Sequence, residues 1–196
     1  MSDEVERIVE KVYNSLEKEV KIQLLVPSSG SSEIKDICNT FAEKLSFGKV
    51  AIEKGEWDGK YPLMKFKENM IYKGLPVGYE FSTYLFIVEL LGSGRIRYFK
   101  DSDIQRIKRY DGKKVVIETL VAPSCPHCPY LSYYTLTLAY LNDNIEGTVI
   151  DLTFAKEYIR KYSVTAVPVT FINGKEVLCG AVPSKIFVNA VLQHVE

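Results

Sequence analysis

The segment LVAPSCPHCPYL, residues 120–131, places two cysteines three positions apart directly after an apolar run that favours a β-strand. A related segment, LLVPSSGSSEIK, stands at residues 24–35 and shares the leucine, proline and serine that precede the cysteines. When the two segments are aligned, Ser29 and Ser32 occupy the positions of the two cysteines. The chain therefore contains one copy of this turn with two thiols and one copy with two hydroxyls.

The similarity extends through both halves of the chain. Residues 20–45 align with 116–141 without a gap, and three more pairs align after the offset grows from 96 to 106: Pro62 with Pro168, Gly74 with Gly180 and Phe81 with Phe187. Proline and glycine matches carry weight because these residues fix unusual backbone geometry. The larger offset predicts that the first half has lost a helix equivalent to FAKEYIRKYSV, residues 154–164, and that KGEWDGKY, residues 54–61, crosses the gap as a loop.

The second half predicts a complete α/β unit, because helical patterns, apolar strands and an Asn-Gly hairpin turn follow one another. We expect helices at 101–110, 125–142, 154–164 and 183–195, strands at 113–122 and 147–152, and a hairpin at 167–180. The order βαβαββα predicts a mixed sheet with helices on both faces, since βαβ crossovers place helices there.

The repeat predicts an α/β fold class with two tandem units, each a central mixed sheet flanked by helices. The boundary is expected near LLGSGRIRYFK, where glycine, serine and charge interrupt the apolar pattern. Residues 1–97 then form a degenerate unit without the cysteine pair, and residues 98–196 form the unit that carries it.

Charge and hydropathy exclude several function classes. Lys plus Arg and Asp plus Glu number 25 each, so the net charge is zero, which argues against a nucleic-acid partner. The charged opening segment, residues 1–20, is typical neither of a signal peptide nor of a membrane span. We expect a soluble, cytosolic protein without a membrane partner. The abundance of Lys, Glu, Ile, Val and Tyr favours a heat-adapted source.

The spacing of Cys125 and Cys128 fits half a zinc site, a redox pair or two buried thiols. A zinc site needs a second ligand pair, and the other cysteines and histidines show no such spacing. The redox alternative is favoured because Cys125 follows a strand and stands at a helix start, with Pro126 in the first turn. Orphan amides and the helix dipole there favour a thiolate. We expect Cys125 to attack a substrate and Cys128 to resolve the mixed disulfide.

Two further residues are expected to tune this pair. His127, between the cysteines, is expected to add positive charge or a hydrogen bond to the Cys125 thiolate; the alternative is an exposed helix residue without a role. Pro168 precedes a strand, where an internal proline would remove a ladder hydrogen bond. A cis Val167–Pro168 bond would avoid that loss and present backbone groups to a substrate chain.

The motif APSCPHC after a strand, followed some forty residues later by YSVTAVPVTFINGK, resembles the thioredoxin superfamily. The tandem arrangement most resembles the protein disulfide oxidoreductases of thermophilic archaea and bacteria, built from two thioredoxin- or glutaredoxin-like units. The resemblance implies that Pro168 is a cis-proline packed against the active-site sulfurs. It also implies exchange with protein thiols and disulfides and reduction by a thioredoxin reductase-like flavoprotein. We expect no bound metal or cofactor.

The sequence departs from that family at several positions. Ser29 and Ser32 replace a cysteine pair, so the first half is expected to be redox-inactive. Thr119 stands where thioredoxins carry a buried acid, and Glu118 is one position away on the opposite face of the strand. CGAVPS, residues 179–184, lacks the aspartate of the glutaredoxin glutathione site, so glutathione is not expected as a substrate.

Two other functions remain open. The tandem pattern also resembles the paired thioredoxin-like region of the flavoprotein that reduces bacterial peroxiredoxin, which predicts an electron carrier with a peroxiredoxin partner. A chaperone-like binding module with an incidental cysteine pair is the third possibility. Cys38 and Cys179 are expected to be lone thiols, and Tyr130 is expected to border a substrate groove.

Overall fold

The computed structural model describes residues 2–194. The first half contains α1 (Asp3–Asn14), β1 (Val20–Pro27), α2 (Ser32–Leu45), β2 (Val50–Trp57), β3 (Leu63–Lys67), β4 (Met70–Lys73), the 3₁₀ turn η1 (Gly78–Glu80) and α3 (Phe81–Ser93). The second half contains α4 (Asp101–Lys108), β5 (Val115–Val121), α5 (Cys128–Leu141), β6 (Ile145–Asp151), α6 (Glu157–Lys161), β7 (Val169–Ile172), β8 (Lys175–Cys179) and α7 (Ser184–Gln193). The predicted end of the closing helix at residue 195 lies outside the described residues.

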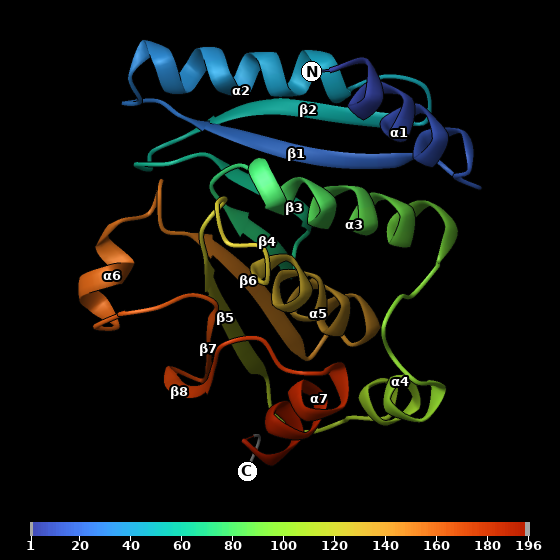
Figure 1. The fold of residues 1–196 in the computed structure, drawn as a ribbon, viewed down its shortest axis with the longest axis vertical. Coiled ribbons are helices and arrows are strands. Elements are labelled where there is room, and N and C mark those ends of the chain that lie inside the picture. The colour runs from blue at the N-terminus through green and yellow to red at the C-terminus, as the bar shows by residue number, and fades with distance from the viewer. Residues whose placement is uncertain (1, 195–196) are drawn as a thin grey trace.

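All eight strands form one mixed sheet in the order β2-β1-β3-β4-β6-β5-β7-β8. Each half contributes four strands in the same spatial order, and β4 pairs in parallel with β6 to join them. The predicted α/β fold of two related units is therefore confirmed, with the refinement that their two sheets are continuous (Figure 1). The predicted boundary at residues 97 and 98 falls between α3 and α4 and stays a prediction.

The first half indeed has no helix between β2 and β3. The prediction of a loop over residues 54–61 is wrong in part, because β2 continues to Trp57 along its whole partner β1. The indole N–H of Trp57 donates a hydrogen bond of 3.0 Å to the Tyr61 carbonyl. Both rings join the smaller apolar cluster, on the sheet face where α6 packs in the second half. Two aromatic side chains thus cover strands that the lost helix would have covered.

The hairpin and the helix starts follow from local sequence. Asn173 and Gly174 both have positive φ, 51° and 78°, as a two-residue turn between β7 and β8 requires. The predicted start of a helix at Cys125 is wrong, because α5 begins at Cys128 and Pro129 is the proline of its first turn. Lys100 precedes α4 and gives that helix no side-chain cap.

The helices α2 and α5 hold corresponding places in the two halves but differ in burial. Ten of the fourteen residues of α5 are buried, whereas α2 buries four of fourteen. The difference arises because α3 of the first half lies beside α5, and β5 and β6 pack on its other side (Figure 1). The helix that follows the cysteine turn is therefore enclosed by both halves of the protein.

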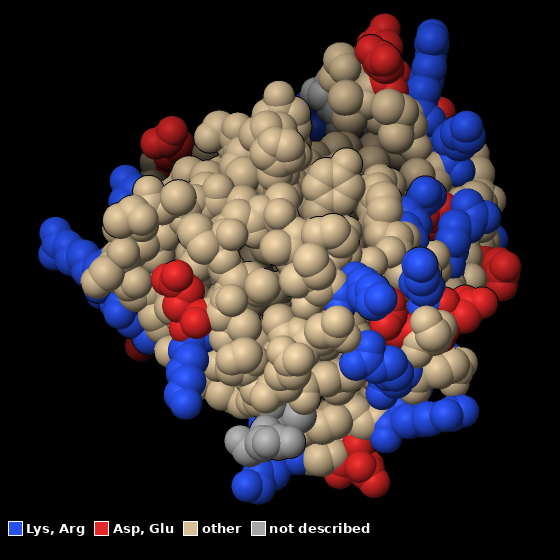
Figure 2. Space-filling view, turned by 60° about the horizontal axis from the view of Figure 1, so that its bottom comes forward, with Lys and Arg blue, Asp and Glu red and all other residues tan. Residues whose placement is uncertain are grey.

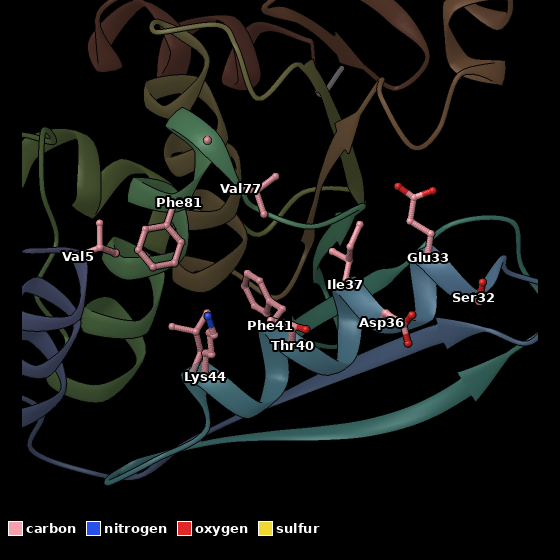
Figure 3. A pocket seen from close by; sticks show the side chains of 12 residues that line it. Val5, Ser32, Glu33, Asp36, Ile37, Thr40, Phe41, Lys44, Val77 and Phe81 are labelled. Atoms are coloured by element: carbon pink, nitrogen blue, oxygen red, sulfur yellow. The ribbon is translucent and has the colours of Figure 1, made fainter. Parts of the chain in front are cut away.

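The surface of the described residues includes a large groove and a face of low charge. The groove, about 820 Å³, lies between α2 and the η1–α3 corner, and Figure 3 shows Ile37 and Phe41 facing Val77 and Phe81 across it. It contains no residue of the cysteine turn. Figure 2 shows a face with few charged side chains at its centre and Lys, Arg, Asp and Glu at its edges. Within residues 2–194, no helix is long and apolar enough to cross a membrane.

Candidate active site

The cysteine turn leaves β5 and is fixed by backbone hydrogen bonds. The N–H of Cys125 donates to the Ala122 carbonyl at 3.0 Å, and the N–H of Tyr79 in η1 donates to the Pro123 carbonyl at 2.9 Å. Gly78 allows this approach, because a Cβ there would lie 2.6 Å from the Pro123 carbonyl oxygen. The first half of the chain thus packs backbone to backbone against the turn.

Cys125 and Cys128 are joined by a disulfide, with Cα atoms 5.5 Å apart. Cys125 is partly exposed, whereas Cys128 is the first residue of α5 and is fully buried. Pro126 and His127 lie in the loop before the helix, and both are exposed. The disulfide nevertheless holds the Cys125 sulfur beside the first turn of α5, where unpaired amide N–H groups favour an anion. A substrate can reach only the outer sulfur of the pair.

The Val167–Pro168 peptide bond is cis, as the family resemblance implied. Pro168 is buried, Val167 is partly exposed, and the Val167 carbonyl oxygen lies 3.9 Å from the Cys125 sulfur. The pair of residues and the cysteine turn therefore meet, although they are about forty positions apart in the sequence. Their roles in substrate binding and in tuning the cysteines stay predictions.

No acid occupies the buried position on β5 below the cysteines. The hydroxyl of Thr119 lies 2.7 Å from that of Thr135 on α5 and 3.0 Å from that of Thr170 on β7, and all three residues are buried. Each of these neutral hydroxyl groups therefore has a hydrogen-bond partner within the cluster. Glu118 points to the opposite sheet face, where its carboxylate accepts a hydrogen bond from the Tyr162 hydroxyl.

A buried carboxyl approaches α5 from the other half of the protein instead. Glu80, the last residue of η1, is fully buried, and its Oε2 accepts a hydrogen bond of 3.1 Å from Thr83. Its Oε1 has no hydrogen-bond partner among the described residues. Burial raises the pKa of Glu80 to about 7, against the opposing effect of the neighbouring Ser132 and Thr83 hydroxyls. Ser132 follows Cys128 by one helical turn, on the same face of α5.

Among residues 2–194, no basic side chain forms an ion pair with Glu80. Tyr72 lies beside it, and the buried Asp151 adds a like charge whose own pKa is raised by burial. Glu89, another buried acid, differs because Arg95 and Arg97 lie 2.9 and 2.6 Å from its carboxylate. Glu89 is therefore a paired structural charge, and Glu80 is a buried carboxyl that changes protonation near neutral pH.

Sequence reasoning missed Glu80. It stands alone between Tyr79 and Phe81 in an apolar stretch, some 45 positions before the cysteines. A single acid in such a stretch is the only signal, and Glu89 shares it. Glu80 reaches α5 only because η1 docks on the Pro123 turn.

The corresponding turn of the first half lacks this enclosure. Ser29 and Ser32 are exposed, and the Ser29 hydroxyl makes a long contact of 3.4 Å with the Gly59 carbonyl. Cys38 is buried and Cys179 is exposed, and neither forms a disulfide. No group of three or more His, Cys, Asp and Glu side chains within residues 2–194 is placed to share a metal ion.

The sequence similarity of this chain to known proteins is clearest in its second half. Residues 115–193 match the thioredoxin domain family. Over 79 residues the chain is 32% identical to thioredoxin from Methanocaldococcus jannaschii, covering 40% of this chain and 93% of that protein. The chain belongs to the thioredoxin superfamily. The thioredoxin domain contains the cysteine turn, the Val167–Pro168 bond and the Thr119 cluster.

The similarity of this thioredoxin-superfamily chain to two other known proteins covers both halves. It is 28% identical over 185 residues to the F subunit of alkyl hydroperoxide reductase from Escherichia coli, an alignment that covers 90% of this chain but 34% of that protein. The crystal structure of a protein disulfide oxidoreductase from Aeropyrum pernix superposes with a TM-score of 0.87 at 21% identity, covering 99% of this chain and 93% of that one. The whole tandem fold, and not only the thioredoxin domain, therefore has known counterparts.

Proposed function

We propose that the protein is a thiol–disulfide oxidoreductase that acts on protein substrates through Cys125 and Cys128. The observation that carries this proposal is the unequal exposure of a bonded cysteine pair at a helix start. A partly exposed sulfur can be reached by a substrate, and a fully buried sulfur beside it can act only on the first. This arrangement suits two-step exchange through a mixed disulfide.

Reduction of a substrate proceeds in two balanced steps. The Cys125 thiolate attacks one sulfur of the substrate disulfide, and the other substrate sulfur leaves as a thiolate. The Cys128 thiol then loses its proton and attacks the Cys125 sulfur, which releases the second substrate thiolate and forms the Cys125–Cys128 disulfide. Two electrons pass from the protein to the substrate, and oxidation of a substrate dithiol runs through the same steps in reverse.

The proton of Cys128 needs an acceptor inside the protein, because this thiol is fully buried. We assign this role to Glu80. Its pKa of about 7 allows the carboxyl to exist in both forms near neutral pH, and its neighbour Ser132 stands one helical turn after Cys128 on α5. A general base works best when its pKa is close to the working pH. The acid that thioredoxins take from the strand is thus supplied here by the first half of the chain.

The other residues that the sequence predicted at the site have supporting roles in this mechanism. The Val167 carbonyl, 3.9 Å from the Cys125 sulfur, is placed to bind the backbone of a substrate chain. Pro168 shields the sulfurs on that side, and the exposed Pro126 and His127 adjust the thiolate and its access. We also keep, as proposals, a cytosolic location and reduction by a thioredoxin reductase-like flavoprotein.

A second candidate is an electron carrier between a flavoprotein and a peroxiredoxin. The similarity to the alkyl hydroperoxide reductase component supports it, because 90% of this chain aligns with that protein. The chain spans about a third of that relative's length, so the relative's full activity is not transferred. A rate of electron transfer to peroxiredoxin far above the rate with insulin would favour the carrier.

The proposed function is tested by insulin reduction with dithiothreitol as the electron source. The wild-type protein accelerates insulin reduction, and Cys125→Ser does not. Cys179→Ser is the matched control, because this exposed cysteine lies outside the pair and should leave the rate unchanged. Full activity in Cys125→Ser would contradict the proposal.

A further inference from the structure

A small hollow lies directly beside the cysteine turn and is formed by both halves of the chain. Its volume is about 200 Å³, and it is lined mainly by Tyr79, Phe86, Tyr98, Pro126, Pro129 and Tyr130. We call this hollow the aromatic pocket. Tyr79 and Phe86 come from the first half, Tyr98 comes from the segment between α3 and α4, and the two prolines and Tyr130 flank the cysteines. It is smaller than the usual pocket for a free ligand, which is about 300–1,000 Å³.

The aromatic pocket presents large, mainly apolar side chains to solvent. Tyr79, Tyr98 and Tyr130 are 56%, 48% and 43% exposed. No Lys, Arg, Asp or Glu residue lines the pocket. Exposed aromatic clusters of this kind mark contact surfaces, because tyrosine gives a large contact area with little loss of side-chain freedom.

The walls of the aromatic pocket are held in place before any substrate binds. Tyr98 has a positive φ of 67°, and its carbonyl accepts a hydrogen bond of 2.5 Å from the Ser184 hydroxyl. Its ring forms T-shaped contacts with the rings of Tyr130 and Tyr133 at centroid distances of 5.5 and 5.8 Å. The N–H of Arg97, one residue earlier, donates to the Tyr133 hydroxyl at 2.8 Å. Such pre-formed walls reduce the entropy that binding costs.

The position of the pocket determines what can occupy it. Pro126 follows Cys125 directly, so the pocket wall begins one residue from the sulfur that forms the mixed disulfide. A substrate attached to that sulfur brings its neighbouring residues past the pocket, since an extended chain advances about 3.3–3.6 Å per residue. The occupant is therefore tethered by the reaction itself, and side chains within about three residues of the substrate cysteine can reach the pocket.

We propose that the aromatic pocket binds an uncharged apolar or aromatic side chain of the substrate protein, within three residues of the cysteine that is attacked. This inference rests on the proposed function, because the mixed disulfide delivers the side chain. It gives the first half and the connecting segment a role in substrate selection, although the first half has no cysteine pair of its own.

The test uses short peptides with one cysteine linked as a mixed disulfide to 5-thio-2-nitrobenzoate. The reduced protein attacks the peptide sulfur and expels coloured thionitrobenzoate, and Cys128 then releases the peptide as a thiol. Phe, Leu, Ser and Asp are placed in turn at each of the three positions on either side of the cysteine. We expect Phe or Leu to react about tenfold faster than Ser or Asp at one position at least, the discrimination typical of an apolar pocket.

The variants are Tyr79→Ser, Tyr130→Ser and the double variant, with Phe47→Ser as a control for loss of an exposed aromatic residue elsewhere. The double variant should react about equally with all peptides, and the control should keep the preference. Exchange with hydroxyethyl disulfide should stay within about twofold in every variant. Equal rates for all peptides with the wild-type protein, or a preference that survives in the double variant, would overturn the inference while leaving exchange itself intact. No exchange with either kind of disulfide would instead refute the proposed function and the inference together.

Discussion

Replacing Glu80 with Gln removes a buried titratable group and keeps the shape of the side chain. The folded protein raises the pKa of this carboxyl from its ordinary value of 4.5 to about 7. The folded state therefore binds the proton more tightly than the unfolded state does. The corresponding stabilisation is complete below about pH 4.5 and is lost as the pH rises through about 7.

The size of this effect follows from the pKa values. The rise from 4.5 to about 7 corresponds to about 3–4 kcal/mol, at about 1.4 kcal/mol per pKa unit. The wild-type free energy of unfolding should fall by this amount relative to Glu80→Gln as the pH increases from about 4 to about 9. Titrating groups distant from Glu80 contribute equally to both proteins, so their pH dependence cancels in the difference.

The assay is guanidinium unfolding of both proteins in the oxidised form, at several pH values across that range. Because the disulfide is kept intact, the same covalent state is compared throughout. We expect Glu80→Gln to become the more stable protein, relative to wild type, above about pH 7. A difference between the two proteins that stays constant within about 1 kcal/mol would refute the assignment of Glu80 as a carboxyl held neutral by burial.

The same substitution should slow the resolving step of exchange. Without the carboxylate, Cys128 loses its acceptor, and release of the substrate from Cys125 should be at least about tenfold slower above pH 7. Formation of the mixed disulfide should keep its wild-type rate. The matched control is Glu118→Gln, since that carboxyl lies on the opposite face of β5 beside Tyr162. Equal slowing of both steps would indicate a general structural defect instead.

Two further predictions concern the first half of the chain. Ser29→Ala and Ser32→Ala should leave insulin reduction unchanged, because both hydroxyls are exposed, lie far from the cysteine pair in sequence and cannot form a disulfide. A loss of activity of more than about threefold would contradict a redox-inactive first turn. Gly78→Ala should lower both the melting temperature and the exchange rate, because its Cβ would lie 2.6 Å from the Pro123 carbonyl oxygen and its φ is 60°. Gly94→Ala is the control, because Gly94 has a φ of 68° and open space around it. This change should cost only the backbone strain of about 1 kcal/mol and leave exchange unaffected. Equal effects of the two substitutions would argue against close docking of η1.

Features set by neighbouring residues were predictable from the sequence. The order of strands and helices in the second half, the Asn173–Gly174 turn and the missing helix of the first half all follow from local patterns. The start of α5 was not predictable, because Pro126 and Pro129 both suit a first turn and only the backbone path distinguishes them. The continuous sheet was not predictable either, because pairing of β4 with β6 depends on which strand edges remain open.

Some residues of the candidate site were likewise predictable from the sequence, and others were not. The cysteine pair and Pro168 were predictable because each lies in a short, recognisable sequence motif. Glu80 carries only the weak signal of a single acid in an apolar stretch, and Tyr98 carries none, since each reaches the site from outside the second half's strands and helices. Glu80 depends on the docking of η1, and Tyr98 depends on the path of the segment between α3 and α4. Contacts between the two halves decide these positions, and local patterns do not encode them.

The division of labour between the two sulfurs can be observed by trapping the covalent intermediate. Cys128→Ser, reduced and mixed with a disulfide-containing peptide, should accumulate an adduct that mass spectrometry of a digest locates on Cys125. The same treatment of Cys125→Ser should give almost no adduct on Cys128, because that thiol is fully buried, and any adduct on the exposed Cys179 is distinguished in the digest. An adduct on Cys128 in Cys125→Ser, formed as fast as the first, would contradict the account.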